Sequence, residues 1–344
     1  MNAKTNWLNL PAEQQKRYIN TIGVEKGLSV ETIEKDWWVT TVLRALFSAP
    51  FAEHLSLKGG TSLSKCWNLI ERFSEDIDIT INREFLGYHG NLSNTKINNG
   101  LRRDSCTFVK GRMRNEIENQ LINSGIDKSF FEIEPRIKLN NKGEEESTTD
   151  PQIIEVHYQS IFPPTNYVQN KVLIEVSGRS MNEPVEKIEI NSMISQYFPN
   201  AKFADDLFLI NVVSPRRTFL EKACLLHEEF AKDVKDIRVE RMSRHLYDLE
   251  KLMDTKIAQE AIEDTELYKA IIAHRQKFVG LKGFDYSTLM PQSISLVPPI
   301  EVLLYWKEDY KNMQSTMIYG ASLPFDKLIE RIKELNERFR NINF

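Results

Sequence analysis

The sequence predicts an α/β protein: a mixed first part of strands and helices, followed by a helical second part. Three observations lead to this prediction. Residues 76–81 alternate polar residues with isoleucine, as a half-buried strand does, and residues 171–177 form a second short strand pattern. Helical spacing of apolar residues dominates from Pro215 onward. We therefore expect two domains, residues 1–214 and residues 215–344.

The N-terminal elements follow from capping residues and apolar spacing. Residues 11–47 are expected to be helical, with Pro11 suited to a first helical turn and Ser29 suited to cap a second helix. The apolar residues of this second helix cover most of its circumference, so we expect it to be buried on several sides. A short apolar stretch then ends at Gly59-Gly60.

The elements after the glycines are predicted in the same way. A helix is expected from Ser62 to about Glu71, before the strand 76–81, and the Asn- and Gly-rich residues 83–102 are expected to form a loop. A helical stretch to about Asn123 follows. The later patterns indicate two apolar-polar segments at 130–139 and 153–161, the strand 171–177, and a C-terminal helix from Phe325 to Phe339.

The composition narrows the class of protein. Hydrophobic residues make up 41% and charged residues 27% of the 344, as in a soluble globular protein. We find no signal peptide and no run of roughly 20 apolar residues, so no membrane span is expected. The three cysteines form no CxxC unit and the six histidines form no HExxH unit. Neither a disulfide framework nor a zinc site is therefore expected, and a cytoplasmic location fits.

The stretch LKGGTSLSKCWNLIERFSEDIDIT, residues 57–80, carries the candidate chemistry. Gly59 and Gly60 allow backbone conformations and close approaches that side chains forbid. A helix starting at Thr61 or Ser62 directs unsatisfied N–H groups at its N-terminus, which suits a triphosphate. Alone, a Gly-Gly pair is usually only a turn.

Asp76 and Asp78 stand two positions apart on the predicted strand, so both carboxylates project from one face. Adjacent carboxylates repel each other unless a cation lies between them, and oxygen ligands beside phosphate suit Mg²⁺. A lone pair of this kind is more often a solvated strand edge. The glycines, the helix and the alternating strand in this order instead favour a metal and nucleotide site.

These residues resemble a known signature. Gly59-Gly60-Thr61 followed by Arg72, Ser74, Asp76 and Asp78 is similar to the pattern of the polymerase-beta-type nucleotidyltransferase superfamily. More closely, it resembles the AbiEii/AbiGii toxin family, which includes the MenT toxins. The stretch IEKDWW resembles the family's helix before the motif. The resemblance extends over roughly residues 31–250 and implies a nucleotidyltransferase-type mixed sheet flanked by helices, with a helical C-terminal domain.

The resemblance also implies roles for residues outside the central stretch. Glu175 lies where the superfamily often places a third carboxylate; the alternative is a solvated strand residue. Lys222 matches the family's lysine and would contact the triphosphate; the alternative is a surface lysine lying along the core. Asp248 matches the family's late aspartate and would be a catalytic residue of the active site; the alternative is a pair with Arg244 on the same helix. Where members often carry an arginine after the lysine, this chain has His227, Glu228 and Glu229.

Three neighbouring residues have simpler expectations. If the strand begins early, Arg72 and Ser74 alternate with the aspartates and border the metal site, Arg72 as a charge partner and Ser74 near the phosphates. Lys65 is expected to be solvated.

A basic stretch at residues 102–114 is the best candidate for a patch that binds the RNA backbone, although an ordinary solvated helix face fits equally. Its basic residues are Arg102, Arg103, Lys110, Arg112 and Arg114, with Arg136 and Lys138 later.

The expected function is therefore magnesium-dependent transfer of a nucleotide from an NTP. The resemblance implies the toxin of a bacterial toxin–antitoxin or abortive-infection system, with a cognate antitoxin. By analogy with MenT proteins, the acceptor is an RNA such as a tRNA 3′ end. Two alternatives stay open: nucleotidylation of a protein or small molecule, and a non-catalytic binding protein on a decayed fold. The sequence does not name the NTP, the acceptor or the oligomeric state.

Overall fold

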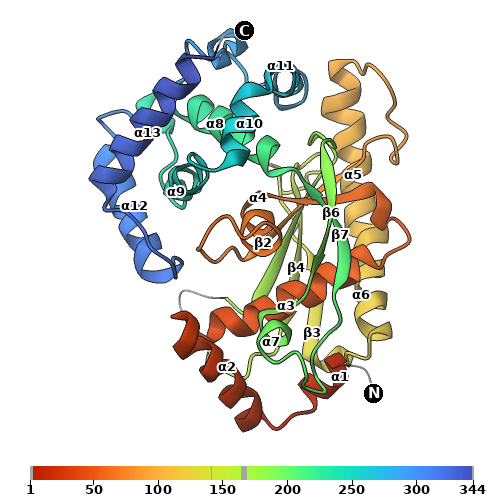
Figure 1. Ribbon diagram of the computed structural model, residues 1–344. Coiled ribbons are helices and arrows are strands. Elements are labelled where there is room, and N and C mark those ends of the chain that lie inside the picture. Colours follow the sequence, from red (N-terminus) through yellow and green to blue (C-terminus); the bar gives the residue numbers. More distant parts are fainter. Residues whose placement is uncertain (1–2, 141, 164–168, 343–344) are drawn as a thin grey trace. The chain divides into compact units, whose positions relative to one another are not determined.

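The computed structural model describes residues 3–140, 142–163 and 169–342. These residues form two compact units (Figure 1). The first unit comprises Met1–Cys66 and Ser74–Val212, and the second comprises Trp67–Phe73 and Val213–Phe344. The second unit thus takes a short segment from the middle of the first part of the chain. None of the described helices is long and apolar enough to cross a membrane.

A seven-stranded mixed sheet organises the first unit, in the order β3-β4-β5-β2-β1-β7-β6. Strand β2 runs antiparallel to β1 and parallel to β5, and β4 runs antiparallel to both β3 and β5. This confirms the predicted α/β class with a mixed sheet. The strands are β1 (Leu55–Lys58), β2 (Asp76–Ile81), β3 (Phe131–Pro135), β4 (Gln152–Tyr158), β5 (Lys171–Ser177), β6 (Val185–Ile190) and β7 (Phe208–Val213).

The two faces of this sheet differ in chemistry. Because side chains alternate along a strand, Ile77 and Ile79 of β2 share one face with Ile174 and Val176 of β5. All four are fully buried. The opposite face carries the polar residues of the same two strands. The sheet is therefore anchored through its apolar face and can use the other face for chemistry.

Helices cover the apolar face. Helix α3 (Val30–Phe47) packs against β2, β5 and α6 (Arg114–Asn123). Its Trp38 stacks on Tyr158 of β4 with ring centroids 5.1 Å apart. Ser29 caps α3 by accepting a hydrogen bond from the Thr32 backbone N–H, and most residues of α3 are buried, as predicted. The remaining helices of this unit are α1 (Ala3–Leu8), α2 (Ala12–Lys26), α4 (Gly59–Thr61), α5 (Arg102–Phe108) and α7 (Met193–Tyr197).

The second unit is helical within its described residues, as expected from the apolar spacing after Pro215. Helix α8 contacts α9, α10 and α11, while α13 contacts α9 and α12. Phe219 of α8 stacks on Phe339 of α13 in the core. The helices are α8 (Pro215–Phe230), α9 (Ser243–Leu252), α10 (Lys256–Glu263), α11 (Thr265–His274), α12 (Leu303–Thr316) and α13 (Phe325–Arg340).

Two predicted boundaries are wrong, and two strands were not predicted. The helix after the glycines ends at Cys66 rather than near Glu71, and Asn68 adopts a left-handed conformation (φ 51°) that stops it. The expected loop 83–102 becomes helical from Lys96, because burial of Ile97 and Leu101 outweighs the low helix propensity of its Asn and Gly residues. Strands β6 and β7 have no predicted counterpart.

Candidate active site

Three carboxylates lie on the polar face of the sheet. Asp76 and Asp78 of β2 both point to this face, and both are half-buried. Strand β5 pairs with β2 in a register that sets Glu175 directly beside Asp78 and Leu173 beside Asp76. Glu175 is half-buried and shares the face of the two aspartates. Two neighbouring strands therefore gather three acidic side chains over a short length of sheet.

The turn between β1 and α4 closes against this acidic face. Gly59 has φ +74°, a conformation that side chains rarely adopt. A Cβ atom at Gly59 would lie 2.1 Å from Oδ2 of Asp78. The carboxylate of Asp78 therefore packs directly on the Gly59 backbone, and only glycine leaves room for it. The predicted need for close approach at the glycine pair is met at this position.

The short helical segment that follows the glycines is tied to the acidic strand. Helix α4 continues as a π-helical turn, Ser62–Cys66. The Thr61 hydroxyl donates to the backbone carbonyl of Asp76 at 2.5 Å, and the Ser62 hydroxyl donates to the carbonyl of Gly59 at 2.9 Å. The side chain of Thr61 thus ties the short helix to the first residue of β2.

The start of β2 differs from the expectation. The strand begins at Asp76, so Arg72 and Ser74 do not alternate with the aspartates on it. Arg72 instead forms an isolated antiparallel bridge with Ile318 within the second unit. Phe73 N–H donates to the carbonyl of Met317, and Tyr319 N–H donates to the carbonyl of Glu71. Residues 71–73 are therefore hydrogen-bonded to residues 317–319 of the second unit and not to the sheet, which explains why β2 begins only at Asp76.

A buried charge cluster in the second unit contains the other predicted residues. Arg72 binds Asp248 through two hydrogen bonds, Nε to Oδ1 at 2.7 Å and Nη2 to Oδ2 at 2.8 Å. Lys222 Nζ lies 2.8 Å from Oδ2 of Asp248 and 3.4 Å from Nδ1 of His245. Asp248 therefore pairs across the unit with Arg72 and Lys222. The surface-lysine alternative for Lys222 is wrong, since its side chain is only 8% exposed.

This cluster has an excess of positive charge. Formally it contains two cations and one carboxylate, and Asp248 is completely buried. Burial alone would raise the pKa of Asp248, but the charges of Arg72 and Lys222 outweigh it and lower that pKa well below its usual range. Burial lowers the pKa of Lys222, and Asp248 opposes this only in part. An anion that reached Lys222 would therefore relieve an electrostatic cost.

The residues that replace the family's arginine have structural partners. The His227 ring accepts a hydrogen bond from the Ser295 backbone N–H. Glu228 pairs with Arg275, whose Nε lies 2.6 Å from Oε1, and Glu229 binds Arg238 and Lys232. The side chains of His227, Glu228 and Glu229 thus all bond to other residues of the second unit.

Sequence reasoning missed a set of buried charges on α3. Lys65, expected to be solvated, has a side chain that is only 7% exposed and pairs with Asp36, at 2.6 Å between Nζ and Oδ1. Lys35, which precedes Asp36 on α3, is paired with Glu75, at 2.5 Å between Nζ and Oε2. The available signal was the charged triplet Glu34-Lys35-Asp36 in a helix whose apolar residues cover most of its circumference.

A different group of potential ligands lies at the edge of the sheet. Ligand atoms of Glu134, Glu155 and His157 lie within 4.8 Å of one another. Both oxygens of Glu155 are already engaged, however, by Arg136 at 2.6 Å and Lys171 at 2.7 Å. These cations supply the charge compensation that a metal ion would otherwise provide, so the group is better described as an ion-pair network.

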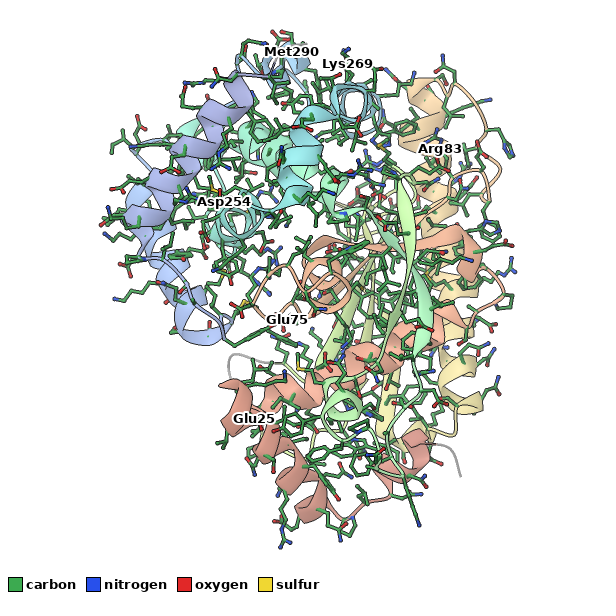
Figure 2. The ribbon with its side chains drawn as sticks, in the orientation of Figure 1. Glu25, Glu75, Arg83, Asp254, Lys269 and Met290 are labelled. Carbon is green, nitrogen blue, oxygen red and sulfur yellow. The ribbon has the colours of Figure 1, made fainter. Side chains whose placement is uncertain are left out.

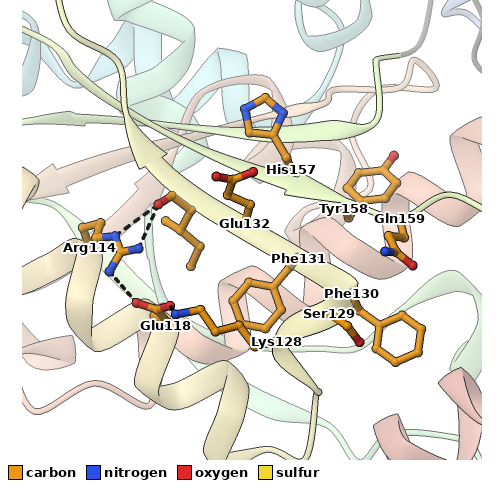
Figure 3. Close-up of a pocket in the computed structure, with 11 residues that line it drawn as sticks. Arg114, Glu118, Lys128, Ser129, Phe130, Phe131, Glu132, His157, Tyr158 and Gln159 are labelled. Carbon is orange, nitrogen blue, oxygen red and sulfur yellow. Dashed lines mark hydrogen bonds and ion pairs between the residues drawn. The ribbon is translucent and has the colours of Figure 1, made fainter.

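A cleft of about 560 Å³ lies beside the same edge strand, β3 (Figure 3). Its walls include aromatic side chains of β3 and β4, but its cations are committed. Arg114 and Lys128 both pair with Glu118, and Arg114 also donates to the carbonyl of Ile133 on β3. Arg114 thereby covers an edge carbonyl, and Pro135 removes an edge donor, so the strand is protected against further pairing.

The predicted basic stretch is partly consumed by contacts within the chain. Lys110 pairs with Glu145, and Arg114 has the partners given above. The guanidinium of Arg112 lies 5.7–6.0 Å from the ring centroids of three phenylalanines. Arg103 makes one long contact with its neighbour Asp104, at 3.4 Å, and is well exposed. Arg103, with Arg102 beside it, is the part of the stretch best placed to meet an anion from solution.

The donor set on the polar face fits a hard cation. Asp76, Asp78 and Glu175 offer only carboxylate oxygens, which Mg²⁺ prefers over nitrogen or sulfur. The contact between Asp78 and Gly59 leaves no side chain between this carboxylate and the adjoining backbone.

A family model described as "Nucleotidyl transferase AbiEii toxin, Type IV TA system" matches residues 41–331. No curated protein matches the chain. One solved structure with similarity is JHP933 from Helicobacter pylori, at 15% identity and a TM-score of 0.34, covering 84% of this chain and 97% of that one. A TM-score of this size supports no argument about fold or function.

Proposed function

This chain belongs to the AbiEii family of nucleotidyl transferase toxins of type IV toxin–antitoxin systems, and we propose that it is a magnesium-dependent enzyme that transfers a nucleotide from an NTP to an RNA acceptor such as a tRNA 3′ end. The observation that carries the proposal is the set of three carboxylates on one sheet face, with the Gly59 backbone packed against Asp78. The first 214 residues would supply the nucleotidyltransferase domain and residues 215–344 a helical domain.

The acidic residues would hold the metal. Asp76, Asp78 and Glu175 are the proposed ligands, because their charges repel one another unless a cation compensates them. Magnesium, when bound, neutralises charge on phosphate oxygens and orients the triphosphate. The backbone of Gly59 and Gly60 and the N–H of Thr61 would approach the phosphates closely, since no side chain of Gly59 stands in the way.

Lys222 is the proposed phosphate contact from the second unit. It belongs to a cluster with a formal excess of one positive charge, and unlike Asp248 its side chain retains some exposure. Asp248 would hold the ammonium group of Lys222 in place, and Arg72 would fix the carboxylate of Asp248 through two hydrogen bonds, so neither would meet the substrate. Ser74 remains a proposed contact on the family pattern alone.

The reaction proposed for these residues is an in-line displacement. The acceptor hydroxyl attacks the α-phosphorus, the bond to the bridging oxygen breaks, pyrophosphate leaves, and the hydroxyl proton passes to solvent or to a nearby carboxylate. The chain contributes positioning and electrostatic stabilisation rather than a covalent intermediate. A cognate antitoxin and action in the cytoplasm follow from the toxin–antitoxin proposal.

The acceptor can be identified by the chemistry of the labelled product. Purified protein is incubated with each α-³²P-labelled NTP and total cellular RNA, and the products are treated with nuclease or protease before electrophoresis. Label that nuclease removes and protease leaves supports an RNA acceptor. Label that only protease removes shows that a protein is modified instead, which would overturn the tRNA proposal while leaving the transferase assignment intact.

A further inference from the structure

Helix α3 carries three consecutive charged residues in a buried turn. Glu34, Lys35 and Asp36 are 6%, 2% and 3% exposed, respectively. Burying ionised groups is costly, and a well-packed apolar replacement of a buried ion pair is often neutral or stabilising. An apolar helix could therefore provide about the same stability as these charges do. Their contacts indicate a different purpose.

Lys35 joins the starts of the two acidic strands. Its ammonium group lies 2.5 Å from Oε2 of Glu75, the residue immediately before Asp76 (Glu75 is labelled in Figure 2). The same group donates to the backbone carbonyl of Gln169 at 3.2 Å, two residues before β5 begins. Because β2 carries Asp76 and Asp78 and β5 carries Glu175, a single side chain holds both strands where they enter the sheet.

Asp36 holds the segment that follows the glycines. One carboxylate oxygen binds the ammonium group of Lys65 at 2.6 Å, and the other accepts the Met193 backbone N–H at 2.7 Å. Lys65 lies in the π-helical turn that continues from Gly59-Gly60-Thr61. Both carboxylate oxygens of Asp36 thus accept a hydrogen bond, one from the turn Ser62–Cys66 and one from the first residue of α7.

We propose that Lys35 and Asp36 are positioning residues for nucleotidyl transfer, fixing the acidic strands and the glycine turn relative to each other. The proposal rests on the proposed function of the acidic face. Thr61 bonds the Asp76 carbonyl from one side, and Lys35 holds the adjoining Glu75 from the helix side. Asp76 is the first residue of β2, so these flanking contacts fix the end of the strand at which it stands.

The test compares Lys35→Met with the double variant Lys35→Met/Glu75→Gln. The single variant leaves a buried carboxylate without its ammonium partner, so it can lose stability. The double variant removes both charges and is expected to fold with a Tm near that of wild type. A displacement of the carboxylates by about 1 Å costs on the order of 100-fold in rate, so both variants should lose about that much kcat. The KM for NTP should change less than about threefold.

Glu34→Gln is the matched control. Glu34 lies in the same turn and is also buried, but it bonds Ser160 and the Ile161 backbone N–H, which belong neither to the acidic strands nor to the glycine turn. It should keep the wild-type kcat whatever its Tm. Hydrogen–deuterium exchange supplies a second readout: amides of residues 74–81 should exchange faster in the double variant than in Glu34→Gln.

The outcomes separate the two proposals. If the double variant folds, transfers at the wild-type rate and shows unchanged exchange in residues 74–81, Lys35 has only a structural role and the inference is wrong. Asp36→Asn should behave like the double variant, with faster exchange in residues 59–66. Asp78→Asn is measured in parallel: if it transfers normally, the proposed function fails, and the positioning proposal fails with it.

Discussion

At the scale of single residues, the function proposed here depends on charges that the fold does not need. Asp76, Asp78 and Glu175 lie on one face of two adjacent strands and repel one another. Asp78→Asn removes one of these charges without opening a cavity. In EDTA its Tm should therefore equal or exceed that of wild type.

The same variant should lose its response to magnesium. A ligand that binds only the folded state stabilises it by about 2.7 kcal/mol at 100 times Kd. Wild type should therefore melt at a higher temperature in Mg²⁺ than in EDTA, whereas Asp78→Asn should not. If calorimetry finds that magnesium raises the Tm of both proteins equally, Asp78 is not a ligand of the metal.

Lys222 gives a prediction for the dependence of NTP binding on pH. Burial lowers the pKa of its ammonium group below the ordinary value of 10.5. The charged form binds phosphate and is present below this pKa, so NTP affinity should fall as the pH rises through it. Lys222→Ala should bind weakly at every pH.

Lys222→Arg should recover part of the affinity and lose the alkaline decrease, because a guanidinium stays protonated. Affinity is best measured by calorimetry between pH 7 and pH 10, with the Tm of each variant checked at the same pH. If wild type and Lys222→Arg show the same pH profile, the titrating group is not Lys222.

At the scale of elements, the turn between β1 and α4 is the part of the site with the least tolerance. Gly59→Ala forces a left-handed conformation and drives a Cβ into Asp78, so it should cost stability and abolish transfer. Gly27→Ala is a matched control, because Gly27 also has a positive φ (+65°) but no atom within 4 Å of its added Cβ.

Both glycine substitutions should cost on the order of 1 kcal/mol through backbone strain alone. Only Gly59→Ala should also displace Asp78 and remove transfer activity. Unfolding in urea and the rate of nucleotide transfer measure the two effects separately. Equal activity of the two variants would mean that the Gly59 contact with Asp78 has no role in the reaction.

Elements with a strong local pattern were predictable. Strand β2 has strict alternation, β5 has a compact strand pattern, and α3 has a capping serine with apolar residues around its circumference. Strand β6 was not predictable, because most of its residues are exposed and its sequence, VEKIEI, is rich in charge. The Lys96 helix start depends on burial against distant residues, which a local pattern does not contain.

The site was predictable to the same degree. The register places Glu175 beside Asp78, whereas the sequence offered only the family resemblance as a reason to expect a third carboxylate on this strand. The partners of Arg72 were not foreseeable, because Asp248 lies 176 positions later in the sequence. Lys65 was misjudged for the same reason: its partner Asp36 belongs to another helix. Long-range ion pairs leave no periodic signal.

At the scale of the whole molecule, an RNA acceptor requires positive surface on a chain with a net charge of −4. Arg102 and Arg103 are the residues of the predicted patch least committed to contacts within the chain. Arg102→Gln/Arg103→Gln should weaken RNA binding and reduce its salt dependence, by about 0.7 in log–log slope for each lost single-strand contact. NTP binding should be unchanged.

Lys256→Gln/Lys269→Gln provides the control, since it removes the same charge from exposed positions on α10 and α11. Fluorescence anisotropy with labelled RNA between 50 and 300 mM salt, roughly the range in which counterion release is resolved, measures both slopes. Equal slopes for the two double variants would show that residues 102–103 do not meet RNA.

The central claim is that this chain transfers a nucleotide, and the fate of two isotopic labels tests it most directly. Wild type and Asp78→Asn are each incubated with Mg²⁺ and total cellular RNA, once with α-³²P-NTP and once with γ-³²P-NTP. The account predicts that wild type moves the α-label onto RNA, releases the γ-label as pyrophosphate, and that Asp78→Asn does neither. Appearance of the γ-label on the acceptor would show phosphoryl transfer, and no covalent label from any NTP would favour a non-catalytic binding protein; either result would contradict the account.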